Sequence, residues 1–120
     1  EFLPHNHTPA CVVYSGTHDN DTTLGWWQQA PDAERDFAAR YLGCGEADVH
    51  RAMIRSAAQS VAVMALYPAQ DVLGLPTEAR MNTPGSLGPQ NWTWRLLPGQ
   101  LGAEDARWLR QLTADSGRLR

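Results

Sequence analysis

Hydrophobic residues in this chain gather in two short runs that are almost continuously apolar. The first run, residues 10–17, reads ACVVYSGT, and the second extends from about Val61 to Leu66. Short apolar runs that contain β-branched residues and lie between turn formers are typical of buried strands. Because neither run alternates with polar residues, each strand is predicted to be covered on both faces, as in a parallel sheet.

Around these two runs, apolar positions recur at helical spacing. Residues 31–43 open with Pro-Asp and close on Gly43, which predicts a capped helix. Residues 46–60 and 103–120 each place apolar side chains on one helical face, so both segments are predicted helices. Residues 77–102 are rich in Gly and Pro and predict a long loop.

The predicted order is therefore strand, helix, helix, strand, loop, helix, which indicates an α/β fold. In such folds, polar residues at the carboxyl ends of parallel strands border the functional site. A carboxylate follows each predicted strand: Asp19 follows the first and Asp71 follows the second. The pattern thus predicts a polar cavity beside the sequence His18-Asp19-Asn20-Asp21.

Composition narrows the classes of function. A chain of 120 residues with 42% hydrophobic residues is globular and suffices for one modest domain. Its net charge of −3, with mixed signs, does not favour nucleic acid, and neither a membrane-spanning run nor a signal peptide is evident. Cys11 and Cys44 are interpreted as free thiols in a reducing cytoplasm. Because the first residues read like the end of one element, we expect a fragment of a longer protein.

Five side chains near the chain start and the first strand tip are of metal-ligating type. They are His5, His7, His18, Asp19 and Asp21. Their spacing matches neither a Cys/His zinc motif nor an HExxH helix, and a calcium-loop match fails at its glycine and at its final glutamate. We therefore assign no metal ligand, and a metal-dependent hydrolase remains an alternative.

A second possible chemistry is nucleophilic catalysis, because Ser15 and Thr17 lie close to His18 in the sequence. No GxSxG motif is present, and neighbouring residues of a strand point to opposite faces. The sequence favours this chemistry least.

A third possible chemistry acts on carbohydrates. Glycosyl transfer passes through an oxocarbenium-like transition state, which carboxylates stabilise. Polar side chains at a strand tip can bind sugar hydroxyls, while aromatic rings on adjacent loops cover the apolar faces of the sugar. The tryptophans available for that role are Trp26, Trp27, Trp92 and Trp94.

Each of these residues also has a purely structural interpretation. Any of the tryptophans could belong to the core. Asp19 could cap a turn or the start of a helix. Arg80 could form an ion pair with Asp71 or Glu78. The residues taken singly leave these alternatives open.

Two long stretches go further than any single residue. YSGTHDNDTTLGWW (14–27) and QDVLGLPTEARMNTPGSLGPQNWTWR (70–95) strongly resemble the C-terminal part of 4-α-glucanotransferases, the amylomaltases or disproportionating enzymes. The shorter stretches FLPHNH and HRAMIRSAAQS are also similar to that family. The resemblance covers nearly the whole chain, with the stretches in the expected order.

The resemblance implies a (β/α)8 barrel, of which residues 1–120 would be a C-terminal fragment holding about the last two βα units. It implies transfer of α-1,4-glucan segments to glucose or maltooligosaccharide acceptors with retention of configuration. The implied partners are maltooligosaccharides or α-glucan and the remainder of the same enzyme chain. The family needs no metal or organic cofactor.

The resemblance also implies roles for particular residues. The THDN motif places the family's third carboxylate, which binds the reacting sugar and stabilises the transition state, at Asp19. His18 falls where the family has a histidine that contacts the same sugar. Candidates for binding the substrate, or for lining and bracing its cleft, are Asn82, Asn20, Gln70 and Arg80.

The nucleophile and the acid/base of a retaining mechanism would lie upstream of Glu1, because such a barrel takes about 250 residues. The isolated chain is therefore expected to be inactive. A non-catalytic glucan-binding module is the alternative function from another class.

Overall fold

Two short parallel strands form the sheet of the computed structural model, which describes residues 3–119. Strand β1 (Val12–Tyr14) pairs with β2 (Met64–Leu66), and Val13 lies opposite Ala65. Both strands fall inside the predicted apolar runs. The α/β class and the parallel pairing are thus confirmed, although each strand is shorter than its run.

The prediction that the strands are covered on both faces is wrong for the described residues. Val13 packs with Ala57 and Ala62, whereas the residues on either side of it in β1 are 42% and 49% exposed. In β2, Met64 and Leu66 are likewise 51% and 44% exposed. Successive strand residues point to opposite faces, and residues 3–119 bury only the face that carries Val13.

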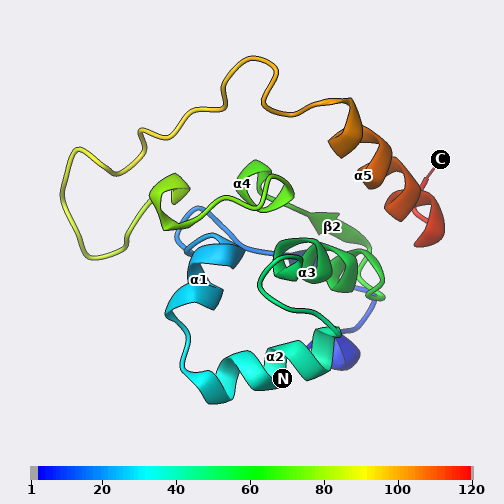
Figure 1. Ribbon diagram of the computed structural model, residues 1–120. Helices are drawn as coiled ribbons and strands as arrows, with labels where there is room; N and C mark the ends of the chain where they lie inside the picture. The colour runs from blue at the N-terminus through cyan, green and yellow to red at the C-terminus, as the bar shows by residue number, and fades with distance from the viewer. Residues whose placement is uncertain (1–2, 120) are drawn as a thin grey trace.

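Both of the helices that were predicted between the strands are confirmed. Helix α2 (Asp32–Leu42) begins after Pro31 and ends at Gly43, whose φ of 66° is the left-handed conformation that favours glycine. Helix α3 (Val49–Ala58) lies within the predicted range and packs against α2, and β2 lies beside it in Figure 1. Val49 and Ile54 of α3 are fully buried, so this helix forms the centre of the core.

Helix α1 (Thr23–Gln29) was not among the predicted helices. The hydroxyl of Thr22 accepts a hydrogen bond from the Gly25 N–H at 3.0 Å and caps the helix. Asp-Thr-Thr before an apolar stretch is a recognisable start signal for a helix. Trp27 is buried against Val49, which explains why this segment folds back onto α3.

After β2 the chain forms the short helix α4 (Ala69–Val72) and the 3-10 turn η2 (Thr77–Ala79). The rest of residues 77–102 is irregular, as predicted, and Figure 1 shows it as a long arch that leads to α5. Helix α5 (Ala103–Asp115) docks on the core through Leu112.

Another 3-10 turn, η1 (Pro4–Asn6), precedes β1. Across residues 3–119, none of the helices combines the length and the apolar character needed to cross a bilayer.

Candidate functional site

The segments that follow the two strands meet at an open cavity with a volume of about 570 Å³. His18 and Asn20 line it from the loop after β1, and Gln70, Asp71 and Arg80 line it from the segments after β2. The carboxyl ends of the parallel strands therefore face a cavity with polar side chains in its lining, as the order of elements predicted.

Asp71 is a structural brace of this cavity. Its side chain is 2% exposed, and its two carboxylate oxygens accept hydrogen bonds from the Thr23 N–H and the Ser15 hydroxyl, both at 2.8 Å. Asp71 thereby ties the end of β1 to the start of α1, on either side of the loop that carries His18 and Asp19. The Ser15 hydroxyl is engaged in this brace, which does not support a nucleophilic role.

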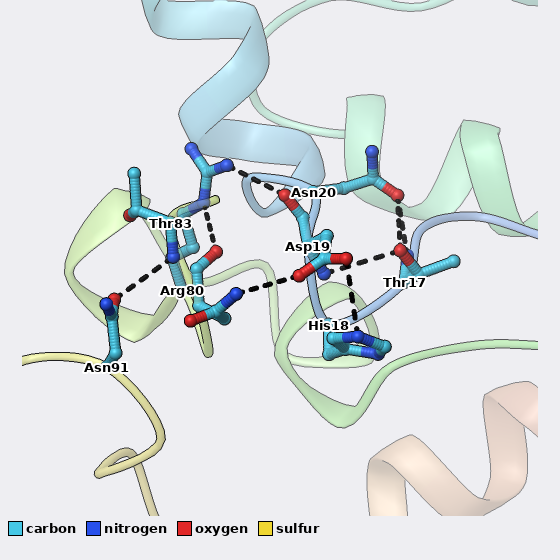
Figure 2. Close-up of polar contacts among 8 residues, drawn as sticks. Thr17, His18, Asp19, Asn20, Arg80, Thr83 and Asn91 are labelled. Carbon is cyan, nitrogen blue, oxygen red and sulfur yellow. Dashed lines mark hydrogen bonds and ion pairs between the residues drawn. The ribbon is translucent and has the colours of Figure 1, made fainter. Parts of the chain in front are cut away.

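Asp19 presents a half-exposed carboxylate held from two sides (Figure 2). The Asn82 side-chain amide donates to Asp19 Oδ1 at 2.8 Å, and the other oxygen lies 3.4 Å from His18 Nε2. Thr22, not Asp19, caps α1. Asp19 itself is not among the residues that line the cavity, whereas its neighbours in sequence, His18 and Asn20, are.

The alternative that Arg80 forms an ion pair with Asp71 or Glu78 is not realised within residues 3–119. Its guanidinium instead donates to two backbone carbonyls, that of Asn82 from Nε and that of Asp19 from Nη2, each at 2.8 Å. Figure 2 shows this guanidinium between the loop after β1 and the segment that follows η2.

The amides of Asn20 and Gln70 brace the walls that they line. Asn20 Oδ1 accepts hydrogen bonds from the Thr17 N–H and hydroxyl, at 2.8 and 3.0 Å. The Thr17 hydroxyl is thus also engaged locally. Gln70 is buried and donates to the Ala79 carbonyl at 3.2 Å, which holds η2 against α4.

Trp92 brings the long loop back to the site. Its ring packs on His18 with 5.1 Å between centroids, and it is 54% exposed. Its φ of 62° is a strained conformation for a non-glycine residue, held by a 2.7 Å hydrogen bond from its N–H to the Met81 carbonyl. In contrast, Trp27 lies in the core and Trp26 packs beside it.

Sequence reasoning missed Tyr67, which directly follows β2 and lines the cavity. Burial raises the pKa of the Tyr67 phenol, against a smaller opposite effect of Arg118. Its hydroxyl therefore stays protonated near neutral pH and is a hydrogen-bond donor as well as an acceptor. Its place at the end of an apolar run was the signal that could have found it.

The candidate metal ligands are not brought together. His5 Nδ1 pairs with the Tyr41 hydroxyl at 2.7 Å, and Asp21 accepts the Thr77 hydroxyl at 2.9 Å. Within the described part of the chain, His, Cys, Asp and Glu side chains form no group of three or more that could hold a metal ion.

Parallel strands whose carboxyl ends face a polar cavity define the chain as part of an α/β protein with its candidate site at that edge. A family model described as 4-alpha-glucanotransferase matches residues 1–100. The chain belongs to the 4-alpha-glucanotransferase family, as its resemblance indicated.

Relatives cover the chain almost completely. It is 50% identical to a 4-alpha-glucanotransferase of Thermus thermophilus over 98% of its length, and 45% identical to the chloroplastic/amyloplastic enzyme of Solanum tuberosum, also over 98%. An amylomaltase of Streptococcus agalactiae, solved in complex with acarbose, matches 98% of the chain with a TM-score of 0.92 and 28% identity. The chain spans only 25%, 21% and 24% of these three proteins, respectively.

Proposed function

We propose that this chain is the C-terminal part of the (β/α)8 catalytic barrel of a 4-alpha-glucanotransferase and holds about its last two βα units. The complete enzyme would transfer α-1,4-glucan segments to glucose or maltooligosaccharide acceptors with retention of configuration. Family membership supports the transfer chemistry. The observation that carries the proposal is the half-exposed Asp19 carboxylate, which Asn82 and His18 hold in the loop after β1, between two residues that line the cavity.

In this proposal Asp19 is the third carboxylate of the reaction. It accepts hydrogen bonds from hydroxyls of the reacting sugar and stabilises the positive charge that develops in the oxocarbenium-like transition state. Such stabilisation is strongest when the charge is held in place beforehand, and the contacts with Asn82 and His18 do this. His18, packed against Trp92, contacts the same sugar.

Asn82, Asn20 and Gln70 are proposed to contact or line the sugar site, and Arg80 to brace it. The amide oxygen of Asn82 makes no hydrogen bond within residues 3–119, so it can accept one from a sugar hydroxyl while the amide nitrogen holds Asp19. The exposed face of Trp92 beside His18 suits the apolar face of a glucose ring.

The remainder of the enzyme chain would supply the nucleophile and the acid/base carboxylate. The exposed apolar residues of β1 and β2 support a further cover, since the adjacent strands of a barrel bury such positions. Between η1, β1, α2 and α3 lies a mostly apolar cavity of about 680 Å³, which offers a second surface for that packing. We propose a cytoplasmic location, which agrees with the free thiols of Cys11 and Cys44.

The test is Asp19→Asn in the complete enzyme, with glucose release from maltotriose as the assay. The substitution keeps the size of the side chain and removes its charge, so turnover should fall at least about 100-fold. Asp36→Asn, at an exposed position of α2, is the matched control and should leave turnover unchanged. A near-normal rate for Asp19→Asn would show that another carboxylate has this role.

Measurements on the isolated chain distinguish the enzyme fragment from a non-catalytic glucan-binding module. We expect no glucose release from maltotriose by the 120-residue chain, because two carboxylates of the mechanism would be missing. Tight binding of maltoheptaose by the isolated chain in titration calorimetry would favour the module instead.

A further inference from the structure

We propose that Arg80 is a positioning residue that acts through Asp19 and does not work by contacting the sugar. This inference rests on the proposed role of Asp19 as the carboxylate that stabilises the transition state. It concerns how the folded chain holds that carboxylate at the required place.

Three hydrogen bonds form a closed ring that includes Asp19 and Arg80 (Figure 2). Arg80 donates to the Asp19 carbonyl and to the Asn82 carbonyl, and the Asn82 side chain donates to the Asp19 carboxylate, all at 2.8 Å. One guanidinium thereby holds the backbone of Asp19 directly and its carboxylate through Asn82. Asp19 and Arg80 are 61 residues apart in sequence, so this ring joins two separate loops.

The guanidinium suits this task for a geometric reason. Its donors lie in one plane at fixed angles, so two bound carbonyls are held at a fixed separation. A lysine ammonium at the end of a flexible chain cannot reproduce that spacing. Residues 17–20 of the loop between β1 and α1 are exposed, and Arg80 anchors this exposed part through the Asp19 carbonyl.

Displacing a catalytic group by about 1 Å can reduce the rate about 100-fold. In the complete enzyme, both Arg80→Ala and Arg80→Lys should therefore lower kcat about 10- to 100-fold while KM for maltotriose changes little. Free guanidinium should restore part of the activity of Arg80→Ala. A loss confined to KM would mean that Arg80 binds substrate directly and would overturn the inference.

Arg118→Ala is the matched control, because Arg118 also donates to backbone carbonyls, those of Ala58, Ser60 and Ala62, at 2.7 to 3.0 Å. Arg118 is not among the residues that line the cavity, and it joins the end of α5 to the segment that follows α3. Its loss should lower the thermal midpoint and leave kcat of the folded enzyme unchanged. An equal loss of kcat in Arg118→Ala would reduce the role of Arg80 to general stability and overturn the inference.

A double variant separates this inference from the proposed function. If Arg80 acts through Asp19, Arg80→Lys combined with Asp19→Asn should be about as slow as Asp19→Asn alone. Multiplication of the two losses would overturn the positioning role and leave the proposed function standing. A near-normal rate for Asp19→Asn would instead refute the proposed function itself.

Discussion

Replacing Asp71 by alanine should loosen the loop that carries the candidate site while the core of the chain stays folded. Asp71 is 2% exposed, and its carboxylate is the acceptor for the Thr23 N–H and the Ser15 hydroxyl at 2.8 Å. Because Thr23 is also buried, its N–H would lose its charged acceptor. Hydrogen bonds to charged groups contribute about 1.5–3 kcal/mol each.

The size of the effect can be measured locally by hydrogen exchange. Loss of one of these bonds, at about 1.5–3 kcal/mol, corresponds to roughly 10- to 150-fold faster exchange in a segment that opens locally, so this range is the lower bound for Asp71→Ala, which removes both. We expect this acceleration in peptides covering residues 15–29, which run from the end of β1 through α1. Peptides of α3 should keep their protection, because Val49 and Ile54 remain fully buried in the core.

Two further substitutions separate the brace from a general loss of stability. Ser15→Ala removes only one of the two hydrogen bonds, so it should accelerate exchange in the same peptides by less than Asp71→Ala does. Asp36→Ala removes an exposed acid of α2 and should have no effect there. Unchanged exchange of residues 15–29 in a folded Asp71→Ala variant would refute the assignment of Asp71 as the brace.

Two other predictions follow from single side chains. Trp92→Gly removes the ring that packs on His18 and also relieves a φ of 62°, so turnover of maltotriose by the complete enzyme should fall without loss of thermal stability, whereas Trp92→Phe should retain more of the rate. Equal rates for the two variants would contradict a role for the ring. Burial, and secondarily the charge of Arg51, lowers the pKa of His50, so the unfolded chain binds more protons than the folded chain just below the ordinary histidine pKa of 6.5. The contribution of His50 to stability is therefore complete above that value and is lost as the pH falls. The urea unfolding midpoint of His50→Gln should accordingly fall less in acid than that of the wild type. An identical pH dependence of the two midpoints would contradict this assignment.

Much of the local structure could be read from the order of the residues. The apolar runs around Val13 and Ala65 predicted two parallel strands, and Gly43 marked the end of α2. These features depend on neighbours in sequence, namely side-chain spacing, branching and the glycine that can adopt positive φ. The missed helix α1 carried a local signal too, in the threonines that start it.

The exposure of the strands could not be read in the same way. Continuous apolar runs predict burial on two faces, but the cover of the second face is not supplied by residues 3–119. A pattern of hydrophobic residues predicts which surfaces are buried, but it does not predict which segment packs against them. The pattern thus agrees with a chain that spans about a quarter of its relatives.

Motifs and spacings within short stretches sufficed to predict the family, the α/β class and the place of His18 and Asp19 after a strand. The hydrogen-bond partners of the polar groups became clear only in the folded chain, because they join segments that are far apart in the sequence. Arg80 and Asn82, which both donate hydrogen bonds to Asp19, lie 61 and 63 residues away from it along the chain. The bonds to Asp19 depend on positions that folding alone brings within 3 Å. Arg80, which could have paired with a carboxylate, instead donates to two backbone carbonyls.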